Sequence, residues 1–141
     1  MRGGLSAVCW PGRLEHVRAG DVDLLFDAAH NPAGAAALRQ YLAEIGWSDA
    51  TLVFGAMQDK DVGGMLSRLA PSCARIVCTT APGARAMAAA DIAERAALAG
   101  GWLVDVEPDP AAALARACHA GRRLVVAGSI FLIGPLRDIL R

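Results

Sequence analysis

The stretch LLFDAAHNPAG, residues 24–34, places an aspartate and a histidine where an apolar run changes into a helix-like segment. The apolar run predicts a buried strand that ends at Asp27, and Asn31 followed by Pro32 is typical of the start of a helix. A purely structural turn needs neither a carboxylate nor an imidazole at this point. His30 could orient a phosphate or transfer a proton near neutral pH, and Asp27 is a candidate for binding at the same point of the chain.

Other polar side chains follow further apolar runs that are also predicted strands. Lys60 lies in GAMQDKD after one run, Arg85 in TTAPGAR after the next, and Ser129 directly after the last. In open α/β sheets, ligands bind beyond the carboxyl ends of the strands. We therefore expect one rim to gather a carboxylate, an imidazole, two cations and a hydroxyl. Such a set can bind an anion or an amino acid, with helix N-termini adding backbone donors.

A structural interpretation of these residues is also open. Asp27, Asp61 and Ser129 are of the types that cap helices or stabilise turns. A single histidine in a turn is more often structural than catalytic. The sequence positions alone do not choose between the two interpretations.

Apolar β-branched runs alternate with segments of helical period, which is typical of βα units around a parallel sheet. The predicted strands cover residues 14–18, 23–27, 51–55, 75–79, 102–106 and 124–127. The first two are joined by AGDV, which is too short for a crossover and predicts an antiparallel hairpin. The fold class expected is α/β, a Rossmann-like three-layer sandwich with a mostly parallel six-stranded sheet and one antiparallel edge hairpin.

The predicted helices fill the remaining connections. The first is capped by Asn31 and stopped by Gly46, and the second is capped by Asp61 and stopped by Pro71. The next two cover about residues 88–99 and 110–120. The last covers residues 129–140, where Gly134 and Pro135 predict a kink or a split.

Composition limits the class of protein. The chain has 141 residues, 55% of them hydrophobic, which is enough for one domain with its own core. Fourteen Lys and Arg balance fourteen Asp and Glu, so no basic footprint of a nucleic-acid binder is expected. No apolar run reaches the roughly 18 residues of a membrane span, and no signal-peptide core is evident, so we expect a cytoplasmic protein without membrane contact. The four scattered cysteines argue against a disulfide framework or a metal site.

Several nucleotide and hydrolase motifs are missing from the sequence. It contains no GxxxxGK[ST], no GxGxxG after a strand and no GxSxG. If the protein uses ATP, the main phosphate-binding loop must lie elsewhere.

Four segments in order carry a resemblance to a known family. They are WPGRLEHV (10–17), LLFDAAHNP (24–32), LVFGAMQDKD (52–61) and LVVAGSIFLIG (124–134). With them the chain resembles the C-terminal domain of folylpolyglutamate synthase and dihydrofolate synthase, members of the Mur ligase superfamily. The resemblance implies a Mur ligase-type glutamate ligase domain at residues 11–141, preceded by an interdomain linker remnant at residues 1–10.

The family ligates an amino acid to a carboxylate that ATP has phosphorylated, and a separate central domain carries the P-loop and Mg²⁺. By resemblance, Arg13 reaches the ATP phosphates, and Asp27 and His30 face the nucleotide and the acyl phosphate. Lys60 resembles a lysine that binds the carboxylate of the incoming amino acid, and Ser129 would lie near the same glutamate.

Two departures from the family pattern stand out. Ala28 replaces the glycine of the usual DGAHNP, which changes the loop if that position needs a positive φ. GSIFLIG replaces the commoner GSFYLVG and loses a tyrosine.

The function expected is that of a C-terminal domain of an ATP-dependent amide ligase. The ligase would add glutamate to folate or dihydropteroate in folate biosynthesis, with ATP and Mg²⁺ bound mainly by the central domain. Alone, the chain should be inactive or nearly so. An alternative is a free-standing, non-catalytic glutamate- or nucleotide-binding module that docks on a separate ATPase chain. An unrelated nucleotide-binding Rossmann-like protein would need a Gly-rich first turn, which is absent.

Overall fold

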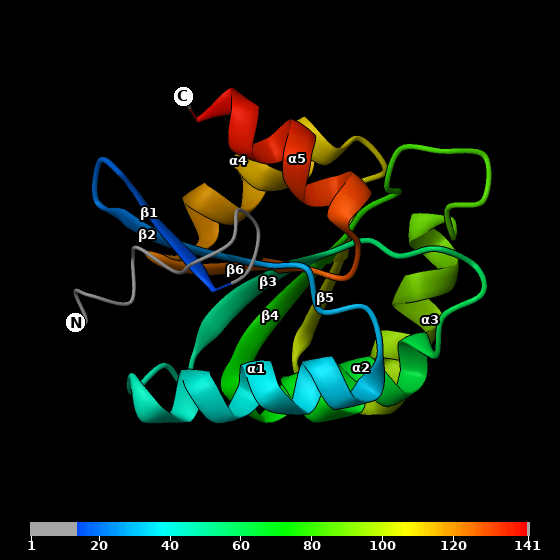
Figure 1. Ribbon diagram of the computed structural model, residues 1–141, viewed down its shortest axis with the longest axis horizontal. Coiled ribbons are helices and arrows are strands. Elements are labelled where there is room, and N and C mark those ends of the chain that lie inside the picture. Colours follow the sequence, from blue (N-terminus) through cyan, green and yellow to red (C-terminus); the bar gives the residue numbers. More distant parts are fainter. Residues whose placement is uncertain (1–13, 141) are drawn as a thin grey trace.

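The computed structural model describes residues 14–140, which form one six-stranded sheet flanked by helices. The strand order is β1-β2-β6-β3-β4-β5, with β1 antiparallel to β2 and the remaining pairs parallel. The strands are β1 (Glu15–Ala19), β2 (Val22–Asp27), β3 (Ala50–Phe54), β4 (Cys73–Cys78), β5 (Leu103–Val106) and β6 (Arg123–Ala127). The expected edge hairpin and parallel sheet are thus confirmed (Figure 1).

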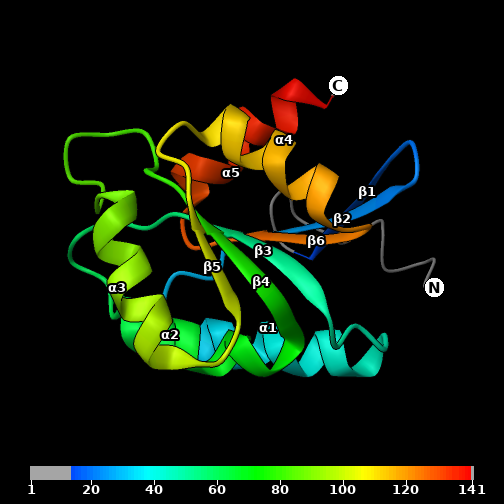
Figure 2. The same ribbon diagram turned by 180° about the vertical axis from the view of Figure 1, so that it is seen from behind.

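Helices cover both faces of the sheet and make three layers. One face carries α1 (Pro32–Glu44), α2 (Val62–Leu69) and α3 (Ala89–Ala99), and the other carries α4 (Pro110–Ala120) and α5 (Ile130–Ile139). A short 3-10 helix, η2 (Ala70–Ser72), follows α2. Figure 2 shows the two helical layers from behind, with the sheet between them.

The alternation of side chains along each strand divides the apolar core in two. Leu25, Leu52 and Ile76 point to the layer of α1, α2 and α3. Their neighbours Leu24 and Val53 point to the layer of α4 and α5. Because both faces of β3 are buried, this strand reads as a continuous apolar run rather than an alternating one.

Helix boundaries follow the expected capping residues. Asn31 Oδ1 accepts the N–H of Gly34 at 2.7 Å, and Asp61 Oδ1 accepts the N–H of Gly64 at 3.0 Å. Gly46 follows α1 with φ +78°, a conformation that side chains disfavour. The strand bounds differ from those expected by one or two residues, as is usual at element ends.

The last helix differs from one of the expected outcomes. α5 is a single helix that contains Pro135, so the expected split at Gly134 and Pro135 does not occur. Pro135 lacks only the one N–H that would bond to Phe131, while Leu132, Ile133 and Leu136 bury the helix against the sheet. Their burial outweighs the missing hydrogen bond.

The N-terminal segment and the apolarity of the helices bear on two further expectations. Residues 1–13, which include Arg13 and the expected linker remnant at 1–10, lie outside the described residues. Within residues 14–140, none of the helices has the length and apolarity required to cross a bilayer.

Candidate active site

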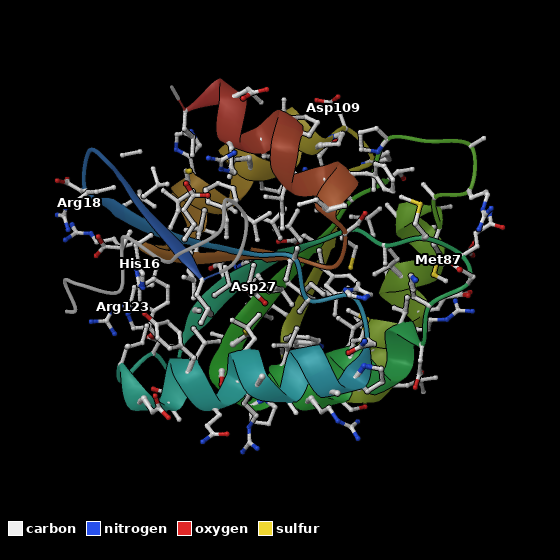
Figure 3. The ribbon with its side chains drawn as sticks, in the orientation of Figure 1. His16, Arg18, Asp27, Met87, Asp109 and Arg123 are labelled. Atoms are coloured by element: carbon white, nitrogen blue, oxygen red, sulfur yellow. The ribbon has the colours of Figure 1, made fainter. Side chains whose placement is uncertain are left out.

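Asp27 ends β2 at the carboxyl edge of the sheet and is 5% exposed. Its Oδ1 accepts the backbone N–H of Leu14 at 3.0 Å, which ties the carboxylate to the chain just before β1. Leu14 has φ +49° and is the one non-glycine residue of the described range with a positive φ. Asp27 therefore accepts a hydrogen bond in a strained turn, which is the turn-stabilising alternative of the structural interpretation and not the helix-capping one. Figure 3 labels Asp27 near the centre of the molecule.

His30 lies in the loop between β2 and α1 and is exposed. Its Nδ1 lies 3.2 Å from the carbonyl oxygen of Ala28. Because a carbonyl oxygen only accepts, Nδ1 must donate, and in a neutral ring Nε2 keeps a lone pair. Ala28 itself does not have a positive φ, so the loop accommodates alanine at this position without backbone strain.

Ser129 is the N-cap of α5 and is 4% exposed. Its Oγ accepts the N–H of Phe131 at 3.1 Å, so the capping role that the sequence left open is real. Capping uses the serine oxygen as an acceptor, and the hydroxyl proton can still be donated to a ligand. The cap and a binding role are therefore compatible.

Gly128 allows β6 to end close to β3. It has φ +114°, and a Cβ at this position would lie 2.3 Å from the carbonyl oxygen of Gly55. Any side chain here would separate the ends of the two strands. This close approach places Ser129 beside the loop that carries Lys60.

A pocket of about 370 Å³ at the carboxyl edge joins three of the predicted site residues. Its lining contains His30, Lys60 and Ser129, together with Ala28, Met57, Gly128, Ile130 and Phe131. Asp27 lies in a neighbouring hollow of about 230 Å³, which His30 also lines. We call the 370 Å³ pocket the His30–Lys60–Ser129 pocket.

Sequence reasoning missed the apolar part of this lining. Phe131 is 60% exposed, and it stands where the family motif usually has tyrosine. Met57 faces the same pocket from the loop after β3. The departure of GSIFLIG from the family pattern was the available signal for Phe131. Met57 had none, because an apolar residue in a loop does not mark a pocket by itself.

The two buried thiols of β4, Cys73 and Cys78, do not line either hollow of the site. Burial raises the pKa of Cys73 to about 12, and burial with the nearby Asp105 charge raises that of Cys78 to about 12. Both thiols stay protonated and unreactive near neutral pH. Within residues 14–140, no three His, Cys, Asp or Glu side chains gather in a way that could hold a metal ion.

Comparisons with known proteins identify the family. The model of the Mur ligase, glutamate ligase domain matches residues 12–130. A dihydrofolate synthase/folylpolyglutamate synthase of Mycobacterium tuberculosis is 45% identical over 80 residues, which cover 56% of this chain and 16% of that protein.

Solved structures extend the match to almost the whole chain. The Mycobacterium tuberculosis folylpolyglutamate synthase complexed with ADP has a TM-score of 0.86 and 33% identity over 99% of this chain and 34% of its own. A bifunctional folylpolyglutamate synthase/dihydrofolate synthase with Mn, AMPPNP and L-glutamate bound has a TM-score of 0.83 and 27% identity, covering 99% and 34%. The chain thus spans about a third of these enzymes.

These matches agree with the order of the four sequence segments and with the strand topology. The resemblance to the C-terminal domain of folylpolyglutamate synthase and dihydrofolate synthase is confirmed. The chain belongs to the glutamate ligase domain family of the Mur ligases.

Proposed function

We propose that this chain acts as the C-terminal domain of an ATP-dependent ligase that joins glutamate to a folate or to dihydropteroate. The observation that carries the proposal is the His30–Lys60–Ser129 pocket, in which an imidazole, an ammonium group and a hydroxyl meet at the carboxyl edge of the sheet. Related enzymes are named folylpolyglutamate and dihydrofolate synthases, and one of them was solved with L-glutamate bound.

Each polar residue of the pocket has a task in this reaction. Lys60 and Ser129 bind a carboxylate of glutamate, because an ammonium group and a hydroxyl proton are both donors to it. His30 offers Nε2 to the proton that the attacking amine must lose, while Nδ1 donates to Ala28. Binding the amine next to an activated carboxyl converts an encounter of two molecules into a reaction within one complex.

Asp27 and Arg13 complete the proposed nucleotide side of the site. Asp27 lies next to His30 in the adjoining hollow. Arg13, outside the described residues, is proposed to reach the ATP phosphates, where a planar fork of donors suits a phosphoryl group. The bond from Asp27 to Leu14 holds the residue that follows Arg13.

ATP and Mg²⁺ are the proposed cofactors. Solved relatives contain ADP or AMPPNP with Mn, which supports a nucleotide and a divalent metal in the family. Residues 14–140 offer no cluster of three metal-binding side chains, so the metal would be held mainly by the central domain. When bound, the metal would neutralise charge on the transferring phosphoryl group.

The test is incorporation of labelled glutamate into a folate in the presence of ATP and Mg²⁺. The chain is assayed alone and mixed with a separately expressed ATPase domain of the family, and the same domain alone is the control. We propose that the enzyme is cytoplasmic, so the assay uses a buffer of near-neutral pH and moderate salt. We expect incorporation only in the mixture.

Two results would count against the ligase. Incorporation at the same rate by the ATPase domain alone would show that this chain contributes nothing. No incorporation in the mixture, with the chain folded and bound to the ATPase domain, would favour a non-catalytic binding module instead.

A further inference from the structure

The strained turn at Leu14 is held by two contacts on adjacent residues. The N–H of Leu14 donates to Asp27 Oδ1 at 3.0 Å. The next residue, Glu15, begins β1 and pairs with Arg137 in the last turn of α5. A non-glycine residue with a positive φ persists only where its surroundings impose that backbone conformation. We therefore treat the Asp27 carboxylate and the Glu15–Arg137 pair as the two constraints that keep Leu14 at φ +49°.

The pair of Glu15 and Arg137 is bidentate and mostly removed from solvent. Arg137 Nε lies 2.5 Å from Glu15 Oε1, and Nη2 donates to Oε2 at 3.0 Å. The side chains are 17% exposed for Arg137 and 26% exposed for Glu15, whereas the Arg18–Asp23 pair of the same hairpin is 64% and 42% exposed. Two parallel donors and low exposure both strengthen an ion pair, so Arg137 holds Glu15 more firmly than Arg18 holds Asp23.

The ladder between β1 and β2 transmits this restraint to Asp27. Glu15 and Arg137 are 122 positions apart, so the pair ties the first strand to the last helix (Figure 1). Glu15 lies opposite Phe26 in the antiparallel register. The next position along each strand brings Leu14 opposite Asp27, where the bond to the carboxylate continues the ladder. A shift of Glu15 would therefore move the Leu14 N–H relative to the carboxylate.

We propose that Arg137 is a positioning residue that orients the Asp27 carboxylate through Glu15. This inference rests on the proposed ligase function, in which Asp27 lies on the nucleotide side of the site. Leu14 is the intermediate, because its N–H fixes one carboxylate oxygen and its side chain lines the hollow of Asp27 and His30. Arg137 lines neither that hollow nor the His30–Lys60–Ser129 pocket, so its effect on the reaction is indirect.

Loss of Arg137 should act on Asp27 by releasing the turn. Glu15 would lose its bidentate partner, and the start of β1 would no longer be tied to α5. Leu14 could then relax to a negative φ, which turns its N–H away from the carboxylate. Catalysis depends strongly on the placement of groups that face a substrate, so a small rotation of Asp27 is expected to be measurable in the reaction.

Arg137→Leu tests the proposal in the labelled-glutamate assay with the ATPase domain. We expect KM for ATP to rise about tenfold with KM for glutamate unchanged, because Asp27 lies on the nucleotide side. A merely structural role would lower the amount of folded chain and leave both KM values unchanged. Arg137→Lys keeps the charge and loses the two parallel donors, so it should recover part of the affinity for ATP.

A double-mutant cycle shows whether Arg137 acts through Asp27. In an Asp27→Ala background, Arg137→Leu should add nothing to KM for ATP, since the carboxylate that it orients is gone. Arg18→Leu is the matched control, because it breaks the other ion pair of the hairpin and should change neither KM value. An unchanged KM for ATP in Arg137→Leu, an equal rise in Arg18→Leu, or additive effects in the cycle would overturn the proposal.

Hydrogen exchange of the Leu14 amide tests the restraint without catalysis. In the folded 141-residue chain, NMR should show exchange of this amide about tenfold faster in Arg137→Leu than in wild type, and unchanged in Arg18→Leu. Unchanged exchange in Arg137→Leu would also overturn the proposal.

The ligase function is judged separately by incorporation in the wild-type mixture. Incorporation with an unchanged KM for ATP in Arg137→Leu would overturn the role of Arg137 and leave the ligase intact. Faster Leu14 exchange without any incorporation would uphold the restraint on the turn and overturn the ligase.

Discussion

The two edges of the sheet both carry polar hollows, and the larger hollow is the less suited to a ligand. The hollow at the amino edge has about 630 Å³ and contains Arg75, Arg122 and Arg123. Two of these arginines are engaged by the protein: Arg75 pairs with Asp105, and Arg123 donates to the carbonyl oxygen of Gly46 and lies over the ring of Trp47. Arg75 and Arg123 therefore stabilise the fold.

The carboxyl edge is arranged differently. Lys60 and Arg85 have a carboxylate neighbour only at 3.9 Å, and His30 and Ser129 have each satisfied one hydrogen bond while keeping another group for a ligand. Figure 3 labels Arg123 and Asp27, which lie at opposite ends of the paired strands β6 and β2. At these two edges, donors that the protein leaves unused mark the candidate site better than the volume of a hollow or the number of charges in it.

The largest expected effect comes from His30 at the carboxyl edge. His30→Ala should lower kcat for glutamate incorporation about a hundredfold, because the amine loses its proton acceptor. The change in melting temperature should be small, since His30 is exposed. Activity is measured in the mixture with the ATPase domain. His119→Ala, at an exposed position near the end of α4, is the matched control, and equal losses in the two variants would contradict the role of His30.

Lys60 provides a direct comparison of the two edges. Lys60→Ala should raise KM for glutamate about tenfold by removing one charged donor, with little change in KM for ATP. Arg122→Ala removes a cation from the amino edge and should change neither constant. Steady-state kinetics at varied glutamate and ATP concentrations measures both KM values in the two variants. A rise in KM for glutamate in Arg122→Ala would erase the distinction between the edges.

Cys73 and Cys78, at the two ends of β4, should affect the stability of the fold and not glutamate incorporation. The pKa of Cys73 and Cys78 is raised to about 12 in the folded chain, whereas the ordinary value is 9.0. Below pH 9 the thiols are protonated in both states, so this contribution to stability is fully present. Above pH 9 the unfolded thiols ionise first, and stability should fall by about 1.4 kcal/mol per pH unit for each thiol.

Urea unfolding of wild type and Cys73→Ala across pH 8 to 10 checks the alkaline effect. The variant starts from a lower stability because it loses core packing, and its stability should depend less on pH. An identical pH dependence in the two proteins would assign the alkaline loss to other groups.

The smallest expected effect is at the pair of Arg75 and Asp105. Their side chains are 31% and 28% exposed, so solvent screens the pair and its loss should cost about 0.5–1 kcal/mol of unfolding free energy. Arg75→Ala should therefore lower the urea midpoint slightly and leave glutamate incorporation unchanged. A loss of activity larger than the loss of folded protein would give the amino edge a functional role.

Most of the fold could be predicted from the sequence because its local patterns agree with one another. The apolar runs of β3 and β6, the capping residues Asn31 and Asp61, and the short connection between β1 and β2 lead to the observed topology. The split that Pro135 suggested does not occur, because burial of the α5 face outweighs one missing hydrogen bond. Such a balance depends on tertiary packing that the local pattern does not contain.

The sequence predicted that polar residues gather at the carboxyl edge of the sheet, but not which of them share a pocket. The position of Lys60 and Ser129 after parallel strands places them at one edge, as expected. That Asp27 would occupy a separate hollow and bond to Leu14 depends on the strained turn before β1, which has no sequence signature. The link between Arg85 and Lys60 depends on backbone bonds between two loops, which the sequence does not mark.

The most direct test of the account compares two double variants in the labelled-glutamate assay with the ATPase domain. His30→Ala with Lys60→Ala removes the proposed proton acceptor and one proposed donor from the carboxyl edge, and Arg75→Ala with Arg122→Ala removes two cations from the amino edge. We predict that the first pair abolishes incorporation and that the second retains the wild-type rate once corrected for folded protein. Equal loss in both, or full activity in the first pair, would contradict the assignment of the site.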